Sequence, residues 1–255
     1  MEGTSTTGGG ALAERFRRAR RDPELAVLEG FHALKHALRF GARVDEAVGT
    51  DVAALERLAA DLAPDLAEAF ASLITTVSGD VLACCAPHVP RTGVLAIARR
   101  PSVDPAVALA DPRVAPIVLL EDPRTMANMG ACVRVAAAAD AAAVLTTGAS
   151  DPWHPDALRG AAGLHYALPV ARIDDLPALG DRPLLAIDPD GDELRPGDLP
   201  ARAILAFGTE REGLSGVLLQ RADGRLRIPM RAGVSSLNLA TSVAAVLYAW
   251  RLHTA

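Results

Sequence analysis

The 255-residue chain lacks the features that mark membrane, secreted and zinc-binding proteins. No apolar run reaches the ~18 residues that a membrane-spanning helix needs, and residues 1–10 are polar, unlike a secretory signal. The three cysteines, two of them adjacent, form no C-x-x-C pair, which argues against a disulfide framework and a thiolate zinc site. We therefore expect a cytoplasmic protein that binds no metal and contacts no membrane.

Aromatic residues are also scarce, at 4%, and only one of the 26 basic residues is a lysine. Half of the residues are hydrophobic, which suffices for a sizeable core. The net charge of −5 leaves no global basic field, so a nucleic-acid site must be a local patch. One candidate patch consists of five arginines: Arg15, Arg17, Arg18, Arg20 and Arg21. It is either a solvated helix face or an arm that contacts phosphate.

Two regions in which helix and strand patterns alternate are separated by a proline-rich stretch. We predict a flexible basic arm over residues 1–23, a small α/β domain over 24–100, a linker over 101–115 and a larger α/β domain over 116–255. Within the small domain we predict helices over 29–40 and 52–70, the latter broken at Pro64, and strands over 44–48, 73–77 and 94–98.

The larger domain alternates short apolar strands with helices, which is typical of a mostly parallel sheet covered on both faces. Strands are predicted over 117–120, 143–147, 168–171, 184–187, 203–207 and 226–228, and helices over 129–139, 156–162, 214–221 and 236–252. Ligands of such sheets bind at the carboxyl ends of strands. The loops of interest are therefore 121–130, 146–153, 208–213 and 229–236.

The first of these loops leads into a helix with the pattern N-x-G-x-x-x-R, at Asn128, Gly130 and Arg134. By itself the pattern is weak, because Asn is a favoured N-cap and Gly permits close packing. Asp140 is not at ion-pair spacing from Arg134, and the helix is alanine-rich. We therefore expect Arg134 to be buried and to need an anion.

Two further motifs follow later strands. Gly208, Glu210 and Gly213 form the pattern G-x-E-x-x-G after the strand AILAF, where glycine lets the backbone approach a ligand. The third segment runs from Ile228-Pro229-Met230 to Ser236-Leu237-Asn238. Its simplest interpretation is that Ser236 caps the last helix and that Asn238 lies in the exposed first turn.

In this order, each after a strand, the three segments resemble the signature motifs of the SpoU/TrmH family of RNA ribose methyltransferases, in the SPOUT superfamily. The resemblance covers about residues 116–252. Residues 24–100 are more weakly similar to the ribosomal-protein-like substrate domain of that family. The resemblance implies a deep trefoil knot in the C-terminal α/β domain, although knots are otherwise nearly absent from proteins.

The resemblance also implies a cofactor, a substrate and an assembly. S-adenosylmethionine would bind in the knot against Gly208, Ile228 and Leu237, with Met230 and Asn238 close by. The substrate would be a ribose 2′-hydroxyl of RNA, with 23S ribosomal RNA favoured over transfer RNA because a substrate domain is present. The protein would be a homodimer with the active site near the interface.

By motif position, the resemblance assigns a catalytic role to five residues. Arg134 would grip a phosphate and polarise the hydroxyl, and Asn128 would hold Arg134 or the ribose. Glu210 would orient the loop or the substrate, whereas Ser236 and Asn238 would form hydrogen bonds at the catalytic centre.

Three positions depart from the family pattern, since Val135, Ala161 and Ala240 replace residues that often carry a hydroxyl. They motivate an alternative, a non-catalytic RNA-binding or ribosome-assembly protein that keeps the cofactor pocket. Methylation of transfer RNA is a second alternative. A third is an α/β enzyme that acts on a small metabolite and shares only the layout.

Overall fold

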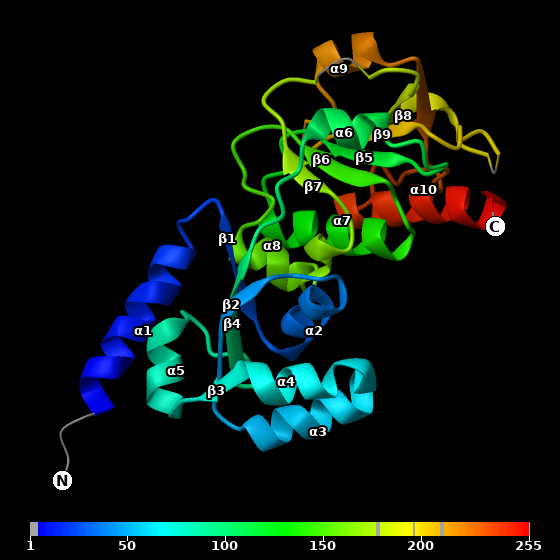
Figure 1. Cartoon of the computed structure of the whole chain (residues 1–255). Helices are drawn as coiled ribbons and strands as arrows, with labels where there is room; N and C mark the ends of the chain where they lie inside the picture. Colours follow the sequence, from blue (N-terminus) through cyan, green and yellow to red (C-terminus); the bar gives the residue numbers. More distant parts are fainter. Residues whose placement is uncertain (1–4, 177–178, 196, 210–211, 255) are drawn as a thin grey trace. The chain divides into compact units, whose positions relative to one another are not determined.

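The computed structural model describes residues 5–176, 179–195, 197–209 and 212–254, and the chain divides into two units (Figure 1). Unit 1 comprises Met1–Ser102 and Trp153–Ala167, and unit 2 comprises Val103–Pro152 and Leu168–Ala255. No helix among the described residues is long and apolar enough to cross a bilayer.

Unit 1 is built on a four-stranded sheet in the order β1-β4-β2-β3, in which β2 and β3 are parallel and the other neighbours are antiparallel. Its elements are α1 (Ser5–Ala19), β1 (Leu25–Glu29), α2 (Phe31–Arg39), β2 (Val44–Gly49), α3 (Val52–Leu62), η1 (Pro64–Leu66), α4 (Ala67–Leu73), β3 (Ile74–Thr76), α5 (Gly79–Cys85), β4 (Val94–Arg99), α8 (Pro155–Gly160) and η2 (Leu164–Tyr166). The three predicted strands and the break at Pro64 are confirmed.

The strand β1 was not predicted, and it shortens the helix predicted over 29–40. Gly30 lies between β1 and α2 with a φ of +95°, a conformation that side chains rarely adopt. It lets the chain turn directly from strand to helix, while its backbone N–H donates to the carbonyl of Val94.

The helix α1 occupies most of the segment that we predicted to be a flexible arm. It packs beside α5 (Figure 1) and buries Leu12 and Phe16 in a cluster with Leu82 and Leu95. Removal of these apolar side chains from water offsets the entropy lost on ordering the segment.

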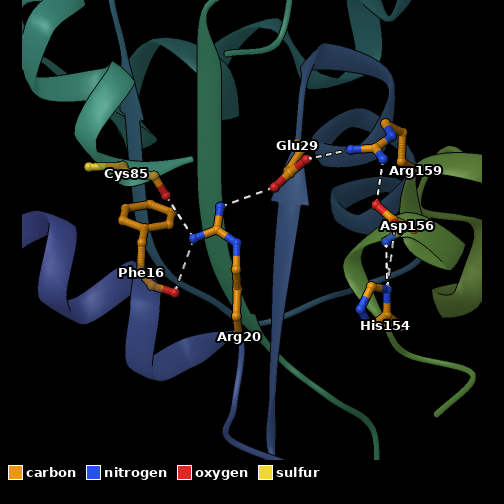
Figure 2. A network of polar contacts seen from close by, with 7 residues as sticks. All are labelled: Phe16, Arg20, Glu29, Cys85, His154, Asp156 and Arg159. Carbon is orange, nitrogen blue, oxygen red and sulfur yellow. Dashed lines mark hydrogen bonds and ion pairs between the residues drawn. The ribbon is translucent and has the colours of Figure 1, made fainter. Parts of the chain in front are cut away.

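The segment Trp153–Ala167 belongs to unit 1, although it lies within the larger domain predicted from the sequence. Figure 2 shows the polar network that holds it. The carboxylate of Glu29, 5% exposed, accepts hydrogen bonds from Arg20 and from Arg159 of α8, each at 3.0 Å. A buried carboxylate needs such partners. Arg159 also pairs with Asp156.

Unit 2 contains a six-stranded, all-parallel sheet in the order β10-β8-β9-β5-β6-β7. Its elements are α6 (Pro105–Ala110), β5 (Ile117–Leu120), α7 (Met126–Ala138), β6 (Ala143–Thr146), β7 (Val170–Arg172), β8 (Leu184–Glu193), β9 (Ile204–Phe207), α9 (Gly216–Arg221), β10 (Gly224–Arg227) and α10 (Leu239–Thr254). The helices α7 and α10 lie side by side along one face of this sheet (Figure 1). The predicted α/β fold with a parallel sheet is confirmed.

Part of the predicted linker is the helix α6, which belongs to unit 2. The stretch after α6 is held in unit 2 by Arg182, whose side chain lies in the core of that unit and is 2% exposed. Its guanidinium donates to four backbone carbonyls, at 2.7–3.1 Å: those of Leu109, Asp111, Ala115 and Arg202. These hydrogen bonds fasten the stretch after α6 to the sheet.

Candidate functional site

The three motif loops meet at the carboxyl edge of the unit 2 sheet, as predicted. There the end of β9, the loop after it and the segment after β10 enclose a cavity of about 440 Å³ with part of β8. We call it the first cavity. Its lining residues are Ile187, Asp188, Pro189, Phe207, Gly208, Thr209, Glu212, Gly213, Ile228, Met230, Ser235, Ser236, Leu237, Leu239 and Ser242.

Four of the five predicted cofactor residues line the first cavity, namely Gly208, Ile228, Met230 and Leu237. Other lining residues were not predicted, among them Ile187, Asp188, Pro189 and Ser242. Three of them lie in β8, which pairs with β9, so the neighbouring parallel strand was the signal that could have found them.

The loop after β9 depends on close backbone contact between two glycines. Thr209 and Gly213 exchange backbone hydrogen bonds of 3.1 Å in both directions. A Cβ atom at Gly208 would lie 2.0 Å from the carbonyl carbon of Gly213, so only glycine fits. Gly213 itself has a φ of +67°. Glu210, between them in sequence, lies outside the described residues.

Ser215 anchors the other end of this loop to Glu121, the residue that follows β5. The backbone N–H and the hydroxyl of Ser215 each donate to the carboxylate of Glu121, at 2.6 Å. The hydroxyl also accepts from the backbone N–H of Leu218 and so caps α9. The two ends of the motif loop are therefore fixed at the edge of the sheet.

Asn238, not Ser236, caps the last helix. The helix α10 begins at Leu239, and the side-chain oxygen of Asn238 accepts from the backbone N–H groups of Ala240 and Thr241 at 3.0 and 3.4 Å. The amide nitrogen of Asn238 donates to the side-chain oxygen of Asn128 at 3.2 Å. This hydrogen bond joins the third motif to the first. Ser236 is exposed and lines the first cavity.

Asn128 lies in the first turn of α7 and lines a second cavity of about 240 Å³. The wall of this second cavity consists of Pro123, Arg124, Thr125, Asn128, Thr209, Glu212 and Leu239. Thr209, Glu212 and Leu239 line both cavities. The two cavities therefore adjoin.

Arg134 is exposed, whereas we expected it to be buried. The buried face of α7 carries Met129, Cys132, Val133 and Ala136, at the spacing of one helix face. Arg134 points away from that face and, among the described residues, lines neither cavity.

The five arginines of the 15–21 cluster lie in unit 1, three of them in α1 and Arg20 and Arg21 just after it, and they differ in exposure. Arg15, Arg17, Arg18 and Arg21 are exposed; Arg15 pairs with Glu46, and both Arg17 and Arg18 pair with Glu14. Arg20 is only 17% exposed and also donates to the carbonyls of Phe16 and Cys85, as Figure 2 shows. We therefore assign Arg20 to the structure of unit 1 and restrict the proposed RNA contact to the other four.

The described residues contain no group of three or more His, Cys, Asp or Glu side chains that could hold a metal ion.

Comparisons with known proteins identify the family. The model of the SpoU rRNA Methylase family matches residues 115–248. An uncharacterized tRNA/rRNA methyltransferase of Mycobacterium bovis is 34% identical over 206 residues, which span 76% of this chain and 70% of the relative. The 23S rRNA (guanosine(2553)-2′-O)-methyltransferase RlmP of Bacillus subtilis is 27% identical over 235 residues, spanning 87% and 86% of the two chains.

The fold has a close counterpart among solved structures. The AdoMet-bound rRNA methyltransferase of Sinorhizobium meliloti superposes with a TM-score of 0.76 and 22% identity. The superposition covers 100% of this chain and 98% of that one.

Proposed function

The chain belongs to the SpoU rRNA methylase family and is an RNA methyltransferase, and from that premise we propose that it methylates a ribose 2′-hydroxyl of 23S ribosomal RNA. The observation that carries the proposal is the Asn238–Asn128 hydrogen bond beside two adjoining cavities: Asn128 lines the second cavity, and Leu239, which follows Asn238, lines both. Methyl transfer needs a donor pocket and an acceptor pocket that share an opening.

S-adenosylmethionine is the cofactor, and the first cavity fits it. Its volume is typical of a small-molecule site. Ile187, Ile228 and Leu237 offer apolar surface for an adenine ring. Asp188 and Ser235 offer acceptors for hydroxyl or amino groups. When bound, the cofactor supplies a sulfonium methyl group with a good leaving group.

The protein must then position the hydroxyl and handle its proton. We assign Asn128 and Asn238 to holding the ribose, Ser236 to a hydrogen bond at the opening of the first cavity, and Arg134 to the phosphate and the hydroxyl. Arginine stays protonated in proteins, so Arg134 acts as a donor that stabilises the developing oxyanion, and the hydroxyl proton passes to solvent water. Glu210 remains a predicted orienting residue of the motif loop.

A homodimer would bring Arg134 to the site. Arg134 is exposed on α7, and the neighbouring helix α10 exposes Tyr248 and Leu252 at 41% and 78%. We propose that two copies bury this α7–α10 face and that Arg134 of one copy reaches the cavities of its partner. Leu252→Glu should convert the dimer to a monomer in light scattering and abolish methylation. A monomeric wild-type protein with full activity would refute this assembly.

Ribosomal RNA is the favoured substrate for two reasons. RlmP, which matches most of this chain, is by its name a 23S rRNA methyltransferase. In addition, unit 1 lies mostly outside the matched residues 115–248, and we propose that it binds RNA through the exposed arginines Arg15, Arg17, Arg18 and Arg21. The trefoil knot of the family is likewise proposed for residues 116–255.

Transfer of labelled methyl from S-adenosylmethionine to unmodified transcripts tests the proposal. We expect label in 23S rRNA and a rate at least about 100-fold lower for Arg134→Ala, with Arg113→Ala as an exposed control. Label only in transfer RNA would overturn the substrate. Cofactor binding without label in any RNA or ribosomal particle would favour a non-catalytic assembly protein.

A further inference from the structure

The second cavity has the polar lining that a nucleotide backbone requires. Asn128, Thr125 and Thr209 offer amide and hydroxyl groups, and Arg124 offers a guanidinium. An acceptor hydroxyl must lie in line with the methyl group, so its ribose must occupy a space that opens onto the cofactor. The wall shared through Thr209, Glu212 and Leu239 provides that opening.

Arg124 is held at this cavity by two carboxylates of unequal geometry. Its Nε donates to Asp122 at 3.2 Å, whereas its NH2 group lies 3.5 Å from Glu212. Arg124 and Glu212 are 66% and 71% exposed. Such an exposed pair contributes little free energy, so a stronger anion can replace Glu212 at little cost.

Asp122 is the fixed member of this arrangement. Its φ is +44°, which is uncommon outside glycine, and its backbone N–H donates to the hydroxyl of Thr147 at 3.1 Å. A Cβ atom on Gly148 would lie 2.2 Å from the Asp122 carboxylate, so the carboxylate fills space that only glycine leaves. Strain of this kind is often kept at functional sites. It presets the direction of the Arg124 guanidinium.

We propose that the second cavity binds the ribose and phosphodiester of the target nucleotide, and that Arg124 is a phosphate ligand in addition to Arg134. In this exchange a phosphate oxygen replaces Glu212 at the NH2 group of Arg124, while Asp122 keeps Nε in place. A guanidinium suits this role because it can donate two parallel hydrogen bonds to phosphate. The inference rests on the proposed function and adds a substrate-binding residue outside the three motifs.

The chain contains a matched control for this test. The tripeptide Asp-Pro-Arg occurs at 111–113 and again at 122–124. In both copies the arginine Nε donates to the aspartate, at 2.8 and 3.2 Å. Arg113 lies outside both cavities. Arg113→Ala therefore removes one positive charge and an equivalent Asp–Arg ion pair without changing the site.

The experiment measures binding and methylation of an unmodified 23S rRNA transcript over a range of salt concentrations. For Arg124→Ala we expect a KM and a Kd for RNA about tenfold higher, with kcat and the Kd for S-adenosylmethionine unchanged. The slope of log Kd against log salt should fall by about one, as for loss of one phosphate contact. Arg124→Lys should restore the slope and part of the affinity, and Arg113→Ala should behave like the wild type.

The inference would be overturned if Arg124→Ala and Arg113→Ala had the same RNA affinity and the same salt slope. Loss of cofactor affinity in Arg124→Ala would also overturn it. The proposed function fails differently, by the absence of methyl transfer in the wild type. Filter binding of the transcript by the same variants would still decide the role of Arg124.

Discussion

The amide nitrogen of Asn238 donates a hydrogen bond to the side-chain oxygen of Asn128, over 3.2 Å and 110 positions of sequence. The same Asn238 caps α10 through its side-chain oxygen. One residue therefore fixes the start of the last helix and the position of the first motif. Its two functions can be separated by substitution.

Asn238→Ala should lose both functions. We expect the free energy of unfolding to fall by about 1 kcal/mol, the usual value of an N-cap, and methyl transfer to fall with it. Asn238→Asp keeps the capping acceptor but sets a carboxylate against the oxygen of Asn128. It should keep its stability in urea unfolding and still lose activity. An Asp variant with wild-type activity would show that the amide link is dispensable.

Gly208→Ala should impair cofactor binding. The added Cβ would overlap the backbone of Gly213, and the motif loop would have to move. We expect the affinity for S-adenosylmethionine, measured by calorimetry, to fall at least about tenfold, which corresponds to about 1.4 kcal/mol. Gly216→Ala is the control, because nothing lies within 4 Å of the added atom. Equal affinities for the two variants would refute the role of this close contact.

Glu29→Gln should destabilise unit 1. The change leaves Arg20 and Arg159 without their shared carboxylate. Since Glu29 is buried, we expect a loss of about 3 kcal/mol in the free energy of unfolding. Asp156→Asn removes only a half-exposed partner of Arg159 and should cost less than about 1 kcal/mol. Urea unfolding of both variants measures these losses, and equal losses of unfolding free energy would contradict the argument from the burial of Glu29.

Acidification should destabilise unit 1 through His36. Burial lowers the pKa of His36 below its usual 6.5, and its Nδ1 lies 2.8 Å from the carbonyl of Ala162. Near and below pH 6.5 the unfolded chain therefore binds the proton more readily than the folded one. The stability present above pH 6.5 should be lost as the pH falls toward 5. In His36→Gln, urea midpoints measured from pH 7.5 to 5 should change less.

The parallel sheet could be predicted because its strands are buried on both sides. Ile117–Leu120, Ala143–Thr146 and Ile204–Phe207 are buried throughout and apolar except at Thr146, which leaves little ambiguity when helices intervene. The loop that carries Gly208 followed from the rule that ligands bind at carboxyl ends of strands, whereas the assignment of Gly208 and Ile228 to the cofactor came from the resemblance to the SpoU/TrmH motifs.

Other features depend on contacts that the sequence pattern does not contain. Glu29 and Arg159 are 130 positions apart, so nothing local indicated that α8 belongs to unit 1. The sequence does not distinguish Arg20 from the neighbouring arginines, whereas in the structure its guanidinium donates to the buried carboxylate of Glu29. Arg134 was expected to be buried because the helix is rich in alanine, but it faces away from the core.

The most direct test of the account is the chemical position of the methyl group. An unmodified 23S rRNA transcript incubated with the protein and labelled S-adenosylmethionine would be digested under alkaline conditions, which cleave next to every free 2′-hydroxyl. We predict that the label is recovered in one alkali-resistant dinucleotide and that Asn238→Asp yields none. Label recovered in mononucleotides would place the methyl group on a base and contradict the account.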